Sequence, residues 1–463
     1  MKYSILLILL AMAIMISPVA WGQYIESVEE ITAGNFFGFG ARQMAMGGTG
    51  LMTNDGASLF YNPANLARIP RIEIHFGMSH QKFDDKSYFR PIRKIVDYNN
   101  IIPSVKTYPG RFEGFTSLAN SSENSKTNTR IGSAIISVPY PTYRGSFVFG
   151  IGVVRVADFD RASRIYHRDD SAGIKAISAV GTEFQSGGLY QWGFGAGFDL
   201  SPKVSIGGTF SLYTGKHEYD WKYDLDSARI YRYHKEQFIE DKYIGVGAKI
   251  GLALQLNQYL GLGLAIESPV SLRVEENSSD YYYISDTGYT DNSELSYVEY
   301  NVKRPFVFSA GMISRIYDAT LMADIDYTDW SQLSYGNNID MEKYNDGIKE
   351  YYRDALRFKT GGEYVFPSLG LSLRGGIFTD PIPIKEQFQN KSRWGYTFGA
   401  GLLIDQVMTI DFAYLHGSYS RNSDFQYSSV YNGDPIILRK SYYLVIDEDA
   451  TYNRLYMTAA YRF

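Results

Sequence analysis

From residue 71 onward, apolar residues alternate with polar or small ones along a series of segments, each roughly 10 to 14 residues long. In the first segment the apolar residues share one face, and they are Ile72, Ile74, Phe76 and Met78. The segments at 147–153, 243–252 and 321–327 follow the same period of two. This period is typical of strands with lipid on one side and a lumen on the other. The pattern therefore predicts membrane-spanning β-strands.

The connections between these segments alternate between short and long. The short ones are 138–144, 199–203, 256–258, 314–317, 366–368 and 405–406. The long ones lie near 82–129, 157–185, 214–240, 275–302, 331–355, 380–392 and 419–451. Seven long loops and six short turns require about 14 antiparallel strands with both ends on one side. We predict an all-β, antiparallel transmembrane barrel over residues 71–463, with the short turns facing the periplasm.

The first residues have the pattern of an export signal. A positive charge precedes an apolar run, Ile5–Ile16, which is too short to span a bilayer as a helix. Small residues at Ala20 and Gly22 fit a cleavage site, so Gln23 is the expected mature start. We predict a signal peptide over 1–22 and export through the secretory pathway.

Composition agrees with a membrane protein and disfavours an enzyme. Aromatic residues make up 16% of the chain, with 40 Tyr, a residue that suits a membrane interface. Cysteine is absent, and a net charge of −5 gives no basic surface for nucleic acid. Neither an HExxH nor a GxSxG motif occurs, and the six scattered histidines are His75, His80, His167, His217, His234 and His416. We predict no catalytic residue, no metal site and no cofactor.

Residues 23–70 do not follow the alternation. A barrel of about 14 strands has a lumen too wide for its own side chains to fill, so we predict that this segment is a plug, or hatch, inside the lumen. Its apolar residues are candidates for a substrate-binding pocket, and they are Phe36, Phe37, Phe39, Leu51, Leu59, Phe60 and Tyr61. The alternative is that they only pack the hatch against the wall.

Several motifs in a fixed order resemble the FadL/TodX family of outer-membrane transporters for hydrophobic compounds. In the hatch they are 40–42, 45–48, 55–58 and 60–64, and in the barrel they are 266–274, 323–331, 374–384 and 411–417. The sequence departs from the family pattern at Asn65, where the family usually has Gly. The resemblance implies a 14-stranded barrel in the outer membrane and an N-terminal hatch that blocks the lumen. It further implies an apolar pocket near the hatch and a sideways exit into the outer leaflet beside a kinked third strand.

The resemblance directs attention to three further sets of residues. Gly150 and Gly152 in the third predicted strand weaken pairing and are candidates for the lateral opening, or they simply face another backbone closely. A hatch turn is expected at Asn62, Pro63 and Ala64, because Pro63 fixes its own φ. Possible partners for a fatty-acid carboxylate are Lys249, Arg357, Lys359 and Arg374. Inward-facing Asp324, Asp326 and Glu363 favour wall salt bridges as the use of these cations.

The last predicted strand ends in an aromatic residue. Its apolar face comprises Leu455, Met457, Ala459, Tyr461 and Phe463. Such an ending resembles the signal that the barrel assembly machinery reads in outer-membrane proteins, and the face itself is expected to contact outer-membrane lipid.

The resemblance implies passive uptake of hydrophobic small molecules, with long-chain fatty acids as the default cargo and hydrocarbons as another. The alternative is a docking barrel for secretion, similar to PorV, which shares a related hatch sequence and transports nothing itself. A polar porin is disfavoured by the apolar hatch.

Overall fold

The computed structural model describes residues 38–97, 104–108, 121–169, 177–227, 231–284, 289–292, 295–381, 383, 385, 393–430 and 439–463. The predicted signal peptide, 1–22, and the first part of the predicted hatch, 23–37, lie outside these residues. Phe36 and Phe37 are therefore among the positions that the structure does not describe.

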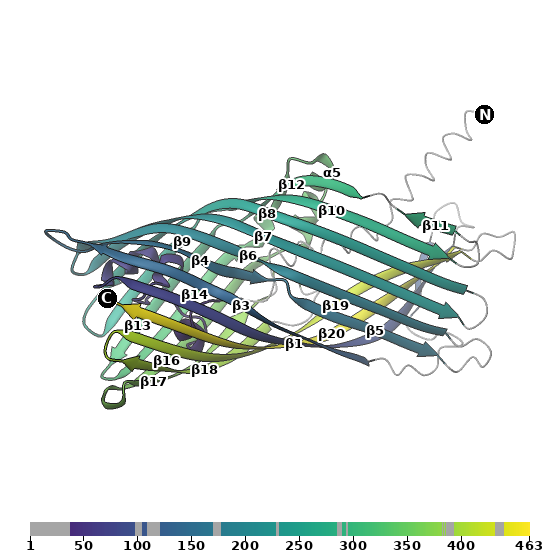
Figure 1. The fold of residues 1–463 in the computed structure, drawn as a ribbon. Helices are drawn as coiled ribbons and strands as arrows, with labels where there is room; N and C mark the ends of the chain where they lie inside the picture. Colours follow the sequence, from purple (N-terminus) through teal and green to yellow (C-terminus); the bar gives the residue numbers. More distant parts are fainter. Residues whose placement is uncertain are drawn as a thin grey trace.

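The wall of the molecule is a closed antiparallel barrel of 14 strands (Figure 1). Eleven of them are β1 Glu73–Asp97, β3 Ser121–Tyr140, β6 Ile177–Ser201, β7 Val204–Ser227, β8 Tyr231–Gln255, β14 Ala319–Asp329, β16 Asp354–Phe366, β17 Leu371–Asp380, β18 Arg393–Ile404, β19 Met408–Val430 and β20 Arg439–Arg462. Three more consist of two segments each, namely β4 Phe147–Asp158 with β5 Arg161–Asp169, β9 Leu260–Glu267 with β10 Val270–Ile284, and β12 Ser296–Arg304 with β13 Val307–Ile316. Short segments extend this wall, namely β2 Ser104–Tyr108, β11 Tyr289–Asn292 and β15 Ser334–Gly336.

Pairing of the last strand with the first closes the barrel. The ladder between β20 and β1 runs from Glu73 opposite Arg462 to Ile95 opposite Lys440. Closure pairs the first strand with the last, because lipid cannot satisfy the backbone N–H and C=O groups that an open edge would expose. The strand count predicted from the spacing of turns and loops is confirmed.

The two faces of the strands differ as the sequence pattern predicts. On β8, Ile244, Val246 and Ile250 are 49–62% exposed on the outer face. Tyr243 and Gly245, which alternate with them, are buried on the inner face. The outer face is therefore an apolar surface for lipid.

The strands are longer than predicted. The region 82–129 was expected to be a loop, but β1 pairs with β20 as far as Ile95 and with β3 as far as Tyr88. The regions 214–240 and 419–451 are likewise largely paired strand. The predicted loop limits are wrong because both strand faces meet water beyond the lipid. Hydrophobic alternation then disappears while backbone pairing continues.

Short helices lie inside the barrel and in the connections between strands. The N-terminal segment, residues 38–70, contains α3 Ala41–Ala45, α4 Ser58–Tyr61 and η1 Pro63–Arg68, and it lies at the end of the barrel that holds the C-terminus (Figure 1). The other helices are η3 Trp330–Gln332, α5 Ile339–Glu342, α6 Asn345–Tyr351 and η4 Pro367–Leu369. None of the helices described here is long and apolar enough to cross a membrane.

Deletion of Phe463 should impair assembly of the barrel. Its backbone N–H donates to Ile72 O at 3.0 Å, and its ring packs on Tyr461 with centroids 4.8 Å apart. The ring is 65% exposed on the lipid face, where insertion machinery can contact it. We expect the membrane level of the truncated protein to fall several-fold, measured by heat-modifiable migration on gels. Deletion of Tyr143, in the exposed turn between β3 and β4, is the control, and equal levels of the two variants would contradict the prediction.

Candidate functional site

The N-terminal segment packs closely against the inner wall because glycines meet it there. A Cβ at Gly207 of β7 would lie 2.4 Å from the Pro63 carbonyl carbon, and one at Gly361 of β16 would lie 2.4 Å from Met46 O. Gly47 has φ +73°, and a Cβ there would lie 2.6 Å from two wall carbonyl oxygens. Larger residues at these positions would push the segment away from the wall.

Hydrogen bonds fix the same segment to strands on several sides of the lumen. The backbone N–H groups of Gly50 and Leu51 donate to Asp324 Oδ2 on β14 at 2.7 and 3.0 Å. At a different strand of the wall, the hydroxyl of Thr209 on β7 donates to Leu59 O at 2.7 Å. These bonds satisfy backbone groups that are buried away from water. The segment is therefore an integrated part of the barrel interior.

Arg42 joins the segment to the wall by charge. Its guanidinium lies 2.9 Å from Glu363 Oε1, and it also lies 3.8 Å from Asp55 within the segment. Glu363 in turn contacts Arg374 at 2.6 Å, and Arg374 contacts Asp411 at 2.6 Å. The result is a chain of alternating charges, partly exposed at Arg42 and buried beyond it, in which each carboxylate has a cation beside it.

The predicted turn at Asn62, Pro63 and Ala64 is present. The Asn62 side chain accepts from Ala64 N at 3.2 Å and donates to Leu51 O at 3.0 Å and to Leu252 O at 3.2 Å. Pro63 begins η1, as its fixed φ favours. Asn65, the departure from the family pattern, also donates to Leu51 O, at 2.7 Å. The turn therefore links the two halves of the segment and joins them to β8.

The predicted pocket residues that the structure describes are packed in clusters with the wall. Phe39, Leu59 and Phe60 are buried in one cluster with Ile135, Val148 and Val154 of β3 and β4. Tyr61 stacks on Phe39 at 4.7 Å and donates to Phe39 O at 3.0 Å. Burial raises the pKa of the Tyr61 hydroxyl, so this group remains a donor. Leu51 is 3% exposed and faces Gly311 of β13.

The four predicted carboxylate partners all lie beside wall carboxylates. Lys249 contacts Glu267 at 3.0 Å and donates to Phe60 O at 2.7 Å. Lys359 contacts Asp326 at 2.7 Å, and the pair formed by Arg357 and Asp380 is 2.6 Å apart. Arg374 pairs with Glu363 and Asp411, as described above. The structure thus brings each cation to a partner within the barrel.

The backbone ladder of the wall is interrupted beside the third strand. β4 pairs with β3 only as far as Val154 opposite Ser133, and β5 pairs with β6. Among the described residues, no backbone pairing joins β5 to the outer part of β3. The register between β4 and β6 also shifts between Arg155 and Ala157. The third strand is therefore bent at this level.

The glycines predicted at the lateral opening lie at another level of the third strand. Gly150 and Gly152 lie inside the intact ladder, opposite Ser137 and Ile135. A Cβ at Gly150 would lie 3.1 Å from Leu59 of the N-terminal segment, so this glycine provides space for packing. The interruption begins beyond Val154, where side chains replace the backbone bonds. The lateral opening at Gly150 and Gly152 stays a prediction.

Polar side chains cross the interrupted part of the wall. Asp160, which lies between β4 and β5, contacts Arg130 at 3.0 Å and Lys126 at 3.4 Å, both from β3. Asn128 of β3 donates to the same carboxylate at 2.7 Å. Unlike a backbone ladder, these contacts can separate by side-chain rotation.

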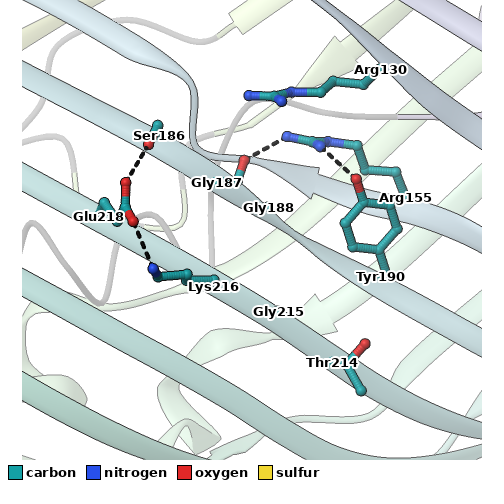
Figure 2. Close-up of a pocket in the computed structure, with 10 residues that line it drawn as sticks. All are labelled: Arg130, Arg155, Ser186, Gly187, Gly188, Tyr190, Thr214, Gly215, Lys216 and Glu218. Atoms are coloured by element: carbon teal, nitrogen blue, oxygen red, sulfur yellow. Dashed lines mark hydrogen bonds and ion pairs between the residues drawn. The ribbon is translucent and has the colours of Figure 1, made fainter.

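A cavity of about 500 Å³ occupies this break (Figure 2). Figure 2 shows Arg155 directed at Gly187 O and at the Tyr190 hydroxyl, the second contact being 2.9 Å. Glu218 lies between Ser186, at 3.2 Å, and Lys216, at 2.7 Å. The lining combines the inner face of β3, through Arg130, with the outer face of β7. A cavity with walls from both faces of the sheet lies in the wall itself.

Inside the barrel, an apolar and aromatic cluster reaches this break. It comprises Phe159, Leu189, Tyr213, Tyr243, Val270, Leu272, Val274, Tyr300, Val302, Trp330, Leu333, Tyr335, Met341, Ile348 and Tyr352. Phe159 lies between β4 and β5, with its ring 5.2 Å from the His217 ring and 5.9 Å from the Tyr243 ring. The bend therefore places an aromatic residue in the lumen and, four residues earlier, Arg155 at the wall cavity. We call the buried cluster that contains Phe159 the luminal aromatic cluster.

Sequence reasoning missed the residues at the break. Arg155 stands at an outward-facing position of an otherwise apolar strand face, yet it is 2% exposed. It contacts Asp158 at 2.6 Å and Asp160 at 3.5 Å. A charged residue that would face lipid was the available signal, because such a position needs a partner within the protein.

Fold and site together define a transmembrane β-barrel of 14 strands that carries its own N-terminal segment inside the lumen. A family-wide sequence profile for the outer membrane protein transport protein family (OMPP1/FadL/TodX) matches residues 190–455, which is more than half of the chain. The chain belongs to this family, whose members are outer-membrane transport channels for hydrophobic compounds rather than enzymes. No curated protein matches its sequence.

Solved structures of similar fold support the architecture. A FadL homologue from Pseudomonas aeruginosa is 16% identical, with a TM-score of 0.59 over 93% of this chain and 100% of the other. The toluene transporter TodX from P. putida is 13% identical, with a TM-score of 0.56 over 93% and 99%. A monoaromatic hydrocarbon channel, CymD, is 13% identical, with a TM-score of 0.52 over 93% and 99%. At these identities the similarity establishes the shared fold.

Replacement of Asn62 by Ala should loosen the N-terminal segment without unfolding the barrel. The change removes the three hydrogen bonds of the side chain, while strand pairing does not depend on it. At about 1 kcal/mol for each bond, local opening of residues 40–68 should become at least tenfold more frequent. Hydrogen exchange measures this opening. Asn257→Ala is the control, because Asn257 also bonds backbone N–H groups but lies in an exposed turn. Equal exchange in both variants would contradict the prediction.

Proposed function

We propose that the chain is a passive channel that carries hydrophobic molecules from the outside of the cell into the outer leaflet of the outer membrane. Molecules enter the lumen from the outer end, contact the luminal aromatic cluster, and leave sideways into lipid at the bend of the third strand. The N-terminal segment acts as a hatch that keeps the axial route closed.

The observation that carries this proposal is the junction at Phe159. This residue belongs to the luminal aromatic cluster and lies between β4 and β5, where the wall lacks a backbone ladder to β3. An apolar interior thus meets an interrupted wall at one place. A cavity of about 500 Å³ occupies the same break.

A sideways exit suits the physical chemistry of the cargo. Apolar surface costs about 25 cal/mol per Å² when it is exposed to water. A molecule that moves from an apolar lumen directly into lipid avoids this cost, whereas axial release into the periplasm would incur it. The hatch opposes axial release, since its backbone and side chains bond to strands on several sides of the lumen.

The class of cargo is the finer part of the proposal. The sequence resemblance favours long-chain fatty acids, and structures of similar fold include channels for toluene and monoaromatic hydrocarbons. The aromatic character of the luminal cluster supports cargo with rings. The ion pairs of Lys249, Arg357 and Arg374 with wall carboxylates support cargo without a carboxylate.

Cross-linking across the interrupted wall should block transport. The chain has no cysteine, so Asn128→Cys with Asp160→Cys introduces a unique pair on the two sides of the break. A short, reductant-cleavable thiol cross-linker should lower uptake of labelled toluene or oleate at least fivefold in cells without their own transporter. Reductant should restore uptake.

The matched control for cross-linking lies in an intact ladder nearby. Lys82→Cys with Thr127→Cys joins directly opposed positions of β1 and β3, which are already held together by backbone pairing. Cross-linking of this pair should leave uptake unchanged. Normal uptake by both cross-linked pairs would refute the sideways exit.

Uptake of toluene and of oleate, measured in cells with equal amounts of the protein at their surface, distinguishes hydrocarbon cargo from fatty-acid cargo. We expect the wild-type chain to raise uptake of toluene more than uptake of oleate, because the described cations of the lumen already face carboxylates. Vector without the gene is the baseline. Preferential uptake of oleate would restore the fatty-acid assignment. Uptake of neither at normal surface level would reject transport and favour the docking barrel.

A further inference from the structure

Two carboxylates lie side by side on the inner face of the barrel. Asp241 of β8 is directly opposite Glu276 of β10, and His217 of β7 is opposite Asp241 on its other side. All three are buried, with 2%, 7% and 3% exposed, respectively. Directly opposed residues have Cβ atoms about 4.5–5.5 Å apart, and like charges at that separation destabilise a sheet. The burial of two directly opposed carboxylates therefore requires a compensating interaction.

Three other inward carboxylates of the barrel have cations beside them. Asp326 faces Lys359, Glu363 faces Arg374, and Glu267 faces Lys249. Such pairing offsets part of the cost of burying charge. The carboxylates Asp241 on β8 and Glu276 on β10 lack such a Lys or Arg partner among the described residues.

The contacts of the two carboxylates involve neutral or weakly basic groups. Tyr243 donates to Asp241 Oδ2 at 2.9 Å, and Tyr300 donates to Glu276 Oε2 at 3.2 Å. His217 Nδ1 lies 3.3 Å from Asp241 Oδ2. Within the described part of the chain, neither carboxylate has an ion pair with Lys or Arg, and Asp241 Oδ1 accepts no hydrogen bond. An acceptor oxygen that is buried and unbonded indicates a missing donor.

Aromatic rings surround this row. Tyr243 and Tyr300 belong to the luminal aromatic cluster, and Tyr335 lies with its ring 5.8 Å from that of Tyr300. Phe159, at the bend of the third strand, packs on the rings of His217 and Tyr243. Aromatic faces attract cations, and the attraction grows when water is excluded. Paired carboxylates among aromatic rings are the chemistry that recognises an organic ammonium group.

We propose that Asp241 and Glu276 form a binding site for the ammonium group of an arylalkylamine, whose ring lies in the luminal aromatic cluster. The ammonium supplies the donors and the positive charge that the two carboxylates lack. A carboxylate ligand is repelled at the same place, and an alcohol supplies a single donor without charge. The site deepens the proposed function, on which it rests, because it names a class of cargo that the lumen binds.

Three probes of matched size test the site. They are 2-phenylethylammonium, 2-phenylethanol and 3-phenylpropanoate, and their binding to the full-length barrel in uncharged detergent at pH 8 is measured by calorimetry. We expect the ammonium probe to bind at least tenfold more tightly than the alcohol and the carboxylate probe to bind most weakly. Equal binding of the ammonium probe and the alcohol would overturn the proposal.

Variants then locate the binding. Asp241→Asn with Glu276→Gln should abolish the preference for the ammonium probe while leaving binding of the alcohol within about twofold. The control is Glu240→Gln with Glu275→Gln, which removes two charges from the adjacent positions of the same strands, on the outer face. It should keep the preference. Heat-modifiable migration verifies that each barrel is folded. A preference that survives in the first variant, or disappears in the control, would refute the site.

This measurement separates the site from the transport proposal. Binding in detergent does not require passage through the wall, so the ammonium preference can be present even if no cargo crosses. Conversely, uptake of toluene without any preference for the ammonium probe would retain the channel and remove the site.

Discussion

Backbone hydrogen bonding in lipid is the constraint on which this structure depends. Each unpaired N–H or C=O group in the hydrocarbon region costs several kcal/mol, so the wall must pair every strand with a neighbour. The ladder from Glu73 opposite Arg462 onward satisfies this requirement for the first and last strands. The interruption beside β5 is acceptable because it lies at the outer limit of the apolar surface. On β7, the outward sequence changes there from Phe210 and Leu212 to Lys216.

The interior obeys the same constraint by other means. A segment without regular pairing can lie at the depth of a membrane only if protein groups satisfy its backbone. Asp324 performs this role for two consecutive N–H groups, and Asn62 performs it at the turn. The buried charges around Arg42 follow from the need to hold this segment without water. The polar groups that hold this segment in the lumen therefore follow from the same requirement as the pairing of the wall.

Much of the architecture could be predicted from the sequence, since a period of two records which face meets lipid. The strand order, the turn at Asn62 and the apolar face that ends at Phe463 all have local sequence patterns. The strand ends have no such local pattern, because paired strands in water show no hydrophobic alternation. The interruption of the wall beside the third strand also could not be located from local sequence patterns. Arg155 and Asp160 meet Arg130 and Lys126 only after β3 and β4 come together, and no spacing in the sequence records that contact. The carboxylate row on β7, β8 and β10 likewise depends on register between strands.

The length of the strands has a consequence for where the molecule works. β1 contains 25 residues, which at about 3.3 Å for each residue and a tilt of about 40° rises roughly 60 Å along the barrel axis. The apolar band of such barrels is only about 25 Å tall. Since the C-terminal end is the one with short turns, the surplus length projects outward. The outer part of the barrel therefore stands well above the lipid, and its lumen opens at a distance from the membrane surface.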